Sequence, residues 1–226
     1  MIGGATRLVG LIGDPVSVSL SPRMQNAAFA ARGLDWAYVP LPVAAARLED
    51  AIRGLVALGF AGANVTTPHK LAAAQLVRAA ASSVNTLVLR DGRLQASSTD
   101  AAILAELEFE SAAILGGGGS AAAFAAALPE AAQFSRRGAW PPTVEGCELV
   151  VNATSERDEV LVELRPGQTL VDLPYPRTAT ARAAEAAGAR VVDGVDVLVA
   201  QGAASFELWT GVPAPVDVMR AALRTV

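Results

Sequence analysis

The chain has 226 residues, of which 52% are hydrophobic and 18% charged, with a formal net charge of −4. This composition is typical of a compact α/β protein and excludes a disordered or fibrous chain. The acidic balance, with no basic stretch longer than Arg136-Arg137, argues against a nucleic-acid partner. A single cysteine, Cys147, rules out an intrachain disulfide and predicts a reducing, cytoplasmic location. No apolar run reaches membrane-spanning length, so we expect no membrane attachment. One Cys with one His rules out a His/Cys zinc cage, and we expect no metal site, with a carboxylate-bound Mg²⁺ as the alternative.

Short apolar runs alternate with helix-periodic segments through the first hundred residues, which predicts βα units with a mostly parallel sheet. Ser21-Pro22 and Thr67-Pro68 should each begin a helix, with proline at its first position. Asp91-Gly92 indicates a two-residue hairpin, so an antiparallel pair should join the sheet. The expected strands are 8–12, 36–39, 63–66, 84–89 and 93–97, and the expected helices begin near residues 21, 44, 67 and 100.

A new βα pattern begins at residue 112. The expected strands are 112–115, 133–134, 149–151, 169–173 and 190–192, and the expected helices are 120–128, 178–187, 197–209 and 216–223. We therefore predict two domains, residues 1–100 and 101–205. The C-terminal helices, from about residue 206 to 226, are expected to pack back on the first domain.

Four glycines, Gly116 to Gly119, directly follow the strand at 112–115 and open an Ala-rich helix. A flexible linker or a plain loop has the same composition. The position, however, is where a dinucleotide-binding fold lets backbone N–H groups approach a pyrophosphate. An NAD site usually has Asp or Glu about 20 residues further on, whereas this chain has Ser135-Arg136-Arg137. Arginine suits a 2′-phosphate, which favours NADP; a solvated surface pair is the alternative.

Polar side chains follow the strands of the first half, where ligands of open α/β sheets bind. These hydroxyls and amides, with one lysine and one aspartate, suit a polyol acid. Lys70 stands in the first turn of a predicted helix, which is electrostatically unfavourable for a cation and therefore favours a functional role. Its ammonium could protonate the oxygen of a ketone that receives a hydride, oriented by a carboxylate such as Asp100.

Five ordered segments of the chain resemble the shikimate dehydrogenase family. They are Asn-Val-Thr-x-Pro-x-Lys at 64–70, Val-Asn-Thr-Leu at 84–87, Asn-Ala-Thr-Ser at 152–155, Asp-Leu-Pro-Tyr-Pro at 172–176 and Val-Asp-Val-Leu-Val-Ala-Gln-Gly-Ala-Ala-Ser-Phe-Glu-Leu-Trp-Thr-Gly at 195–211. The resemblance implies an α/β fold with an N-terminal substrate-binding domain, whose sheet is mostly parallel, and a shortened C-terminal Rossmann domain for NADP. It also implies a cytoplasmic enzyme, a monomer or homodimer, that interconverts 3-dehydroshikimate and shikimate.

The resemblance implies residue roles at the matching positions. Lys70 and Asp100 would be the catalytic pair, and His69 is not required for catalysis. The residues that would bind the substrate are Ser19 and Ser21 at its carboxylate, Tyr175 nearby, and Asn64, Thr66, Asn85 and Gln201 at ring hydroxyls. The residues that would line the cofactor site are Gly116, Gly118, Gly119, Ser135, Arg136, Arg137, Asn152, Ala153 and Thr154.

The chain departs from the family pattern at Val18 and Ser98, where relatives usually have His and Asn. Only eleven residues separate Arg137 from Leu149, too few for a full helical crossover, so we expect a trimmed cofactor domain. A quinate or broader polyol-acid dehydrogenase is an alternative, because serines and amides do not determine every ring substituent. A non-catalytic binding or regulatory relative is a second alternative, against which the retained catalytic pair argues.

Overall fold

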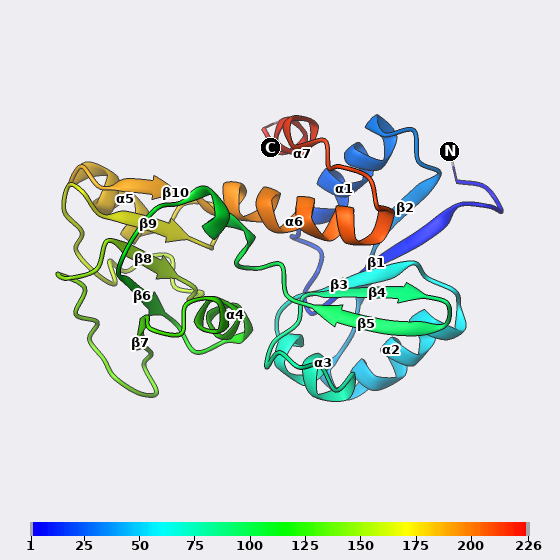
Figure 1. The fold of residues 1–226 in the computed structure, drawn as a ribbon, viewed down its shortest axis with the longest axis horizontal. Helices are drawn as coiled ribbons and strands as arrows, with labels where there is room; N and C mark the ends of the chain where they lie inside the picture. Colours follow the sequence, from blue (N-terminus) through cyan, green and yellow to red (C-terminus); the bar gives the residue numbers. More distant parts are fainter. Residues whose placement is uncertain (1, 225–226) are drawn as a thin grey trace. The chain divides into compact units, whose positions relative to one another are not determined.

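The computed structural model describes residues 2–224, and the chain divides into two compact units (Figure 1). The first comprises Met1–Thr99 together with Val199–Val226, and the second comprises Asp100–Leu198. Each unit has one five-stranded sheet, which confirms the predicted α/β class. Within the described residues, no helix combines the length and the apolar character that crossing a bilayer requires.

The sheet of the first unit has the order β2-β1-β3-β4-β5. Its strands are β1 (Arg7–Gly13), β2 (Trp36–Pro42), β3 (Gly62–Val65), β4 (Thr86–Arg90) and β5 (Arg93–Ser97). The first three are parallel, and β4 and β5 are antiparallel to their neighbours, which confirms the predicted hairpin. Because β4 begins and β5 ends where β1 and β3 end, the residues flanking all four strands meet at one edge of the sheet.

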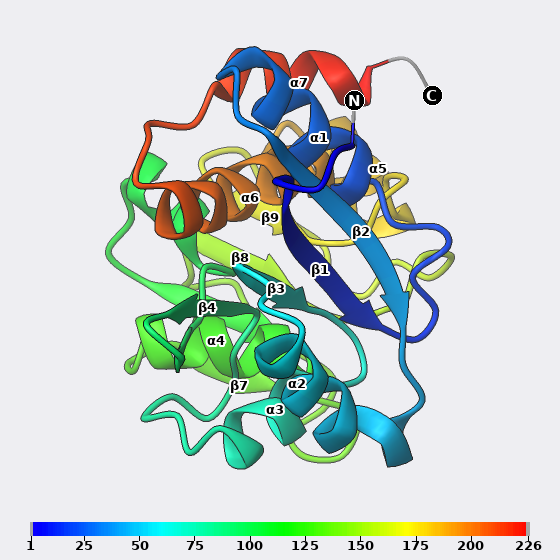
Figure 2. The ribbon, with the colours of Figure 1, turned by 90° about the vertical axis from the view of Figure 1, so that its right-hand side faces the viewer.

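Helices cover both faces of this sheet (Figures 1 and 2). On one face lie α2 (Leu48–Ala57), after a 3₁₀ turn η1 (Ala45–Arg47), and α3 (Lys70–Leu76). The stripe Leu48, Ile52 and Leu55 recurs at helical spacing and packs in a core that includes Ile12 and Leu87.

The opposite face is covered by α1 (Ser21–Ala31), by α7 (Val216–Leu223) and by the end of α6 (Gly194–Thr210). Gly202 allows α6 to approach α1 closely, because a Cβ there would lie 2.2 Å from Met24 Cε. Further along α6, the rings of Phe29 and Phe206 stack at 5.4 Å, and Trp209 Nε1 donates to Leu87 O at 2.9 Å. The C-terminal helices therefore belong to the core of the first unit.

The second unit has a fully parallel sheet in the order β10-β9-β8-β6-β7. Its strands are β6 (Ala112–Leu115), β7 (Ala132–Phe134), β8 (Leu149–Asn152), β9 (Thr169–Asp172) and β10 (Arg190–Val192), and its helices include α4 (Gly119–Ala127) and α5 (Ala179–Ala186). This is the order of a dinucleotide-binding sheet without the outermost strand beside β7.

Two irregular segments of the second unit replace crossover helices. Residues 135–148 join β7 to β8, and residues 153–168 join β8 to β9, both without a helix. These segments bury Val144, Leu161 and Leu164 in the hydrophobic core of the second unit. The three side chains pack where a crossover helix would otherwise contribute its apolar face. The shortened Rossmann unit expected from the sequence is confirmed.

Two helix predictions need correction. The helix expected over residues 100–109 is wrong: only the 3₁₀ turn η2 (Ala102–Glu106) forms, and Leu107 is extended. Acidic residues at 106, 108 and 110 would oppose the macrodipole at the end of such a helix. The helix expected from Thr67 starts at Lys70 instead, because Thr67 O accepts the N–H of Asp14 at 3.1 Å and Thr67-Pro68 forms a turn.

Candidate functional site

The polar edge of the first unit carries Lys70 as the first residue of α3. Lys70 as a whole is only 9% exposed, and its backbone carbonyl accepts the N–H of Val84 at 3.3 Å. That bond ties the start of α3 to the segment leading into Asn85. Asp100, which directly follows Thr99 in the chain, is 7% exposed. Burying an ammonium or a carboxylate is costly, which sets both side chains apart from ordinary surface charges.

Serine side chains follow β1 at the same edge. Ser19 Oγ accepts the N–H of Ser21 at 3.3 Å, and Ser21, the first residue of α1, is 7% exposed. The structure thus brings the two serines together at the start of a helix, where N–H groups favour anions. Val18, where relatives usually have His, is 75% exposed.

The structure brings Asn85 and Gln201 together from distant parts of the chain. Asn85 Oδ1 accepts from the N–H of Thr99 at 2.8 Å and from Thr86 Oγ1 at 2.9 Å. Asn85 Nδ2 donates to Thr99 Oγ1 at 3.0 Å and to Gln201 Oε1 at 3.3 Å. These bonds define the orientation of the Asn85 amide and leave Gln201, on α6, at the sheet edge.

Asn64 lies beneath these groups and is 5% exposed. Its Oδ1 accepts from Tyr38 OH at 2.8 Å. Its Nδ2 faces Asn85 O at 2.9 Å, Ser205 Oγ at 3.1 Å and Thr86 Oγ1 at 3.2 Å. Both ends of the Asn64 amide are therefore engaged by neighbouring protein groups.

Three residues of this network, Thr86, Thr99 and Ser205, were assigned no role in the sequence analysis. Ser205 connects the two threonines to α6. It is fully buried on α6, one turn after Gln201, and its Oγ donates to Gln201 O at 3.0 Å. Thr86 Oγ1 and Thr99 Oγ1 lie 2.8 and 3.0 Å from it. The i, i+4 spacing from Gln201 was the signal available in the sequence, because it places both residues on one helix face.

We expect Ser205→Ala to lower the free energy of unfolding by about 1–3 kcal/mol, because the buried polar groups of Asn64, Thr86 and Thr99 lose a hydrogen-bond partner. Chemical denaturation measures the change. Thr210→Ala, further along the same helix, is the control, since the Thr210 hydroxyl is only half-buried and donates to Phe206 O in its own helix. An equal, small loss in both variants would show that Ser205 does not hold the network.

The glycine run of the second unit forms a tight turn between β6 and α4. Gly116 has φ +131°, and a Cβ there would lie 2.8 Å from Ala153 O, so only glycine fits. Gly118 is the N-cap of α4 and Gly119 its first residue, and nothing lies within 4 Å of a Cβ at Gly118. An open backbone turn at a helix N-terminus fits a dinucleotide pyrophosphate. A flexible linker would not require these contacts.

Asn152 and Asp172 form a buried pair at the ends of β8 and β9. Asn152 Nδ2 donates to Asp172 Oδ1 at 2.7 Å, and Asn152 Oδ1 accepts from Thr154 Oγ1 at 2.8 Å. Burial raises the pKa of Asp172, opposed by hydrogen bonds from Asn152 and Thr178. Asn152 thus holds Thr154 beside the glycine turn, and Tyr175 follows β9 half-buried.

Ser135 and Arg136 directly follow β7, beside the glycine turn. Gly116 N donates to Phe134 O at 2.8 Å, and a Cβ at Gly117 would lie 3.6 Å from Ser135 Cβ. The Arg136 guanidinium lies 5.8 Å from the Trp140 ring centroid. Arg136 is exposed, as is Arg137, which leaves both accessible to a ligand.

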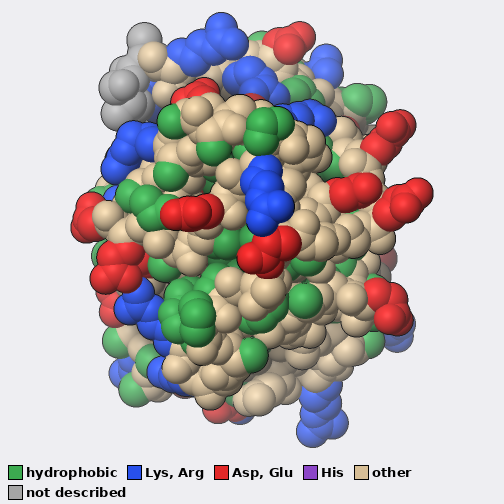
Figure 3. Space-filling model, turned by 90° about the vertical axis from the view of Figure 1, so that its left-hand side faces the viewer, with side chains coloured by type: hydrophobic (Ala, Val, Ile, Leu, Met, Phe, Trp, Pro, Cys, Tyr) green, Lys and Arg blue, Asp and Glu red, His purple; other side chains and the backbone are tan. Residues whose placement is uncertain are grey.

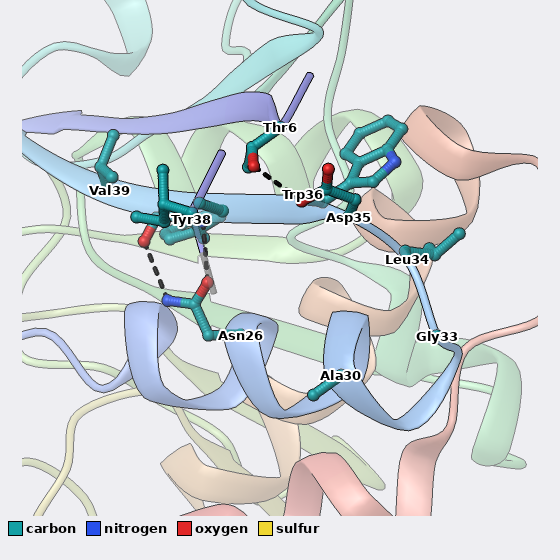
Figure 4. A pocket seen from close by; sticks show the side chains of 11 residues that line it. Thr6, Asn26, Ala30, Gly33, Leu34, Asp35, Trp36, Tyr38 and Val39 are labelled. Atoms are coloured by element: carbon teal, nitrogen blue, oxygen red, sulfur yellow. Dashed lines mark hydrogen bonds between the residues drawn. The ribbon is translucent and has the colours of Figure 1, made fainter. Parts of the chain in front are cut away.

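A surface hollow of about 620 Å³ lies elsewhere, between α1 and the outer edge of β2 (Figure 4). None of the predicted site residues lines it. Asn26 occupies the backbone hydrogen-bonding groups of Tyr38 at the outer edge of β2. Its Nδ2 donates to Tyr38 O at 2.9 Å, and its Oδ1 accepts from Tyr38 N at 2.8 Å. Pro40 and Pro42, at alternate positions of β2, have no N–H to offer. This edge is protected against strand addition.

Charges and possible metal ligands are dispersed. On the face in Figure 3, acidic and basic side chains stand singly or in small groups, without a broad field of one sign. Among residues 2–224, no three His, Cys, Asp or Glu side chains gather as metal ligands would.

A parallel sheet with the strand order of a dinucleotide-binding fold, a glycine turn and a buried lysine define the class of nicotinamide-dependent dehydrogenases. Residues 11–87 match the shikimate dehydrogenase substrate binding domain, and residues 194–224 match the shikimate 5′-dehydrogenase C-terminal domain. The chain is 41% identical to the shikimate dehydrogenase (NADP(+)) of Anaeromyxobacter dehalogenans, covering 98% of this chain and 97% of that protein. It belongs to the shikimate dehydrogenase family.

Solved structures agree with this assignment. The shikimate 5-dehydrogenase of Thermus thermophilus, in complex with NADP(H) and shikimate, matches with a TM-score of 0.81 and 29% identity, covering 96% of this chain and 98% of that one. The enzyme of Aquifex aeolicus matches with a TM-score of 0.85 and 27% identity, covering 99% and 100%. The alignment with the Anaeromyxobacter protein spans 280 positions, so dozens of them have no counterpart in these 226 residues.

Proposed function

We propose that this protein is an NADP-dependent shikimate dehydrogenase, which interconverts 3-dehydroshikimate and shikimate. The observation that carries the proposal is 41% identity, over 98% of the chain, to a shikimate dehydrogenase (NADP(+)). Burial of Lys70 and Asp100 supports a catalytic role for both, since a binding protein has little use for two costly buried charges.

Lys70 is assigned as the proton donor in the direction of ketone reduction. Bound NADPH supplies the hydride that reduces the carbonyl carbon. The Lys70 ammonium gives one proton to the carbonyl oxygen, which becomes a hydroxyl, and is left as a neutral amine. Asp100 orients the ammonium and shares its proton, and in shikimate oxidation the neutral amine accepts the hydroxyl proton. Such acid–base assistance is worth roughly 10²–10⁴-fold in rate.

The substrate is assigned to the polar edge of the first unit. Ser19 and Ser21 would bind its carboxylate through their hydroxyls and the N-terminus of α1. Thr66, Asn85 and Gln201 would bind ring hydroxyls, with Tyr175 contributing near the carboxylate. Asn64 would also bind a ring hydroxyl, and its Nδ2 donates to the carbonyl oxygen of Asn85, which holds Asn85 in place.

The cofactor is assigned to the edge of the second sheet that carries the glycine turn. The open backbone at Gly118 and Gly119 suits the pyrophosphate, and only glycine fits at Gly116. Ser135, Arg136 and Arg137 would bind the 2′-phosphate. Asn152, Ala153 and Thr154 would line the opposite side of the turn. Cytoplasmic location and a monomeric or homodimeric state stay predictions.

The proposal is tested by an assay that crosses shikimate and quinate with NADP⁺ and NAD⁺, following the absorbance of reduced nicotinamide. We expect the fastest reaction with shikimate and NADP⁺. Faster oxidation of quinate would favour the broader polyol-acid dehydrogenase. No reaction in any of the combinations would overturn the proposal in favour of a non-catalytic family member.

A further inference from the structure

Arg136, which the proposed function assigns to the 2′-phosphate, already has acidic partners in this structure. Its Nη2 lies 2.5 Å from Glu159 Oε2 and 3.8 Å from Glu156 Oε2. Both the Arg136 and Glu159 side chains are more than half exposed. An exposed pair of this kind is weak, so a ligand anion can replace the carboxylate.

The chain holds Glu159 in place through its backbone. Glu156 Oε1 accepts the N–H groups of Arg157 at 2.9 Å and Asp158 at 3.0 Å, which closes a turn directly before Glu159. The same bonds lower the pKa of Glu156, with a smaller contribution from Arg136. Thr180 Oγ1, at the start of α5, donates to Glu159 O at 3.3 Å. These hydrogen bonds hold the backbone at Glu159, and the Glu159 carboxylate contacts Arg136.

The ion pair crosses the strand that carries the glycine turn. Arg136 follows β7 and Glu159 lies in the segment after β8, and β6 lies between these two strands in the sheet. Both segments are irregular connections that replace crossover helices. The ion pair therefore joins two irregular segments at the adenosine end of the proposed site.

We propose that Glu159 is a specificity-determining residue that competes with the 2′-phosphate of NADP for Arg136, an inference that rests on the proposed function. Binding NADP exchanges the carboxylate for a phosphate and leaves Glu159 facing a dianion. NAD has an uncharged hydroxyl at this position, so it leaves the ion pair intact. Glu159 therefore weakens NADP binding selectively, and the chain discriminates between the two cofactors less sharply than Arg136 alone would allow.

Calorimetric titration of the full chain with NADP⁺ and with NAD⁺, without substrate, tests this inference. One repulsive unit charge at contact distance corresponds to roughly a fivefold change in Kd. Glu159→Gln should therefore tighten NADP⁺ binding about fivefold and change NAD⁺ binding by less than about twofold. Glu130→Gln is the matched control, because it makes the same charge change at an exposed site before β7, at the other end of that strand from Arg136.

The outcomes separate this inference from the proposed function. Unchanged NADP⁺ affinity in Glu159→Gln, equal tightening of both nucleotides, or equal tightening in the Glu130 control would overturn the role of Glu159 while leaving the NADP site in place. Absence of NADP⁺ binding by the unaltered protein would instead refute the cofactor assignment itself.

Discussion

Lys70→Ala is expected to lower kcat for shikimate oxidation at least about a hundredfold, at the low end of what acid–base assistance contributes. The variant should still bind shikimate, because the serines, amides and hydroxyls assigned to the substrate remain. Steady-state kinetics gives kcat, and equilibrium titration with shikimate gives its Kd. Unchanged kcat would remove Lys70 from the mechanism.

Lys70→Arg separates proton transfer from charge. Lys70 is the only lysine of the chain, since the other 17 of its 18 basic residues are arginines. Arginine keeps the positive charge but does not release a proton in proteins, whereas a lysine can do so. We therefore expect Lys70→Arg to lose activity nearly as fully as Lys70→Ala. Substantial activity in the arginine variant would mean that Lys70 acts through its charge.

Arg136→Ala is expected to raise the Kd of NADP⁺ at least about tenfold, because a charge-assisted guanidinium–phosphate contact is lost. The Kd of NAD⁺, which has no 2′-phosphate, should change little. Titration with both nucleotides measures the difference. Arg182→Ala, an exposed arginine on α5 of the same unit, is the control for loss of one positive charge. A uniform loss for both nucleotides would remove Arg136 from 2′-phosphate recognition.

Features determined by local chemistry were predictable from the sequence. Asp91-Gly92 forms the hairpin because both residues adopt the positive φ that this turn requires. The four glycines mark the turn between β6 and α4 for a similar reason, since Gly116 has no room for a side chain. The helix predicted to begin at Thr178 begins one residue later, as α5. Thr178 is its N-cap, and the Thr178 hydroxyl accepts from Ala181 N at 3.0 Å.

Features that depend on contacts between distant segments were not predictable. Residues 135–148 and 153–168 have no hydrophobic period, so nothing in them indicated that Val144 and Leu161 would be buried or that Glu159 would reach Arg136. Ser205 joins its network through residues more than a hundred positions away. The sequence did contain two overlooked signals, the i, i+4 spacing of Ser205 from Gln201 and the single lysine among 18 basic residues.

The central claim is that this chain transfers hydride from NADPH to a ketone of a hydroxylated cyclic acid while Lys70 protonates the oxygen. The most direct measurement supplies 3-dehydroshikimate with NADPH deuterated at the transferable position and analyses the product by mass spectrometry and NMR. We predict shikimate with one deuterium at the carbon that bears the new hydroxyl, formed by the unaltered protein and at least about a hundredfold more slowly by Lys70→Ala. Unlabelled shikimate, or no shikimate from the unaltered protein, would contradict the claim.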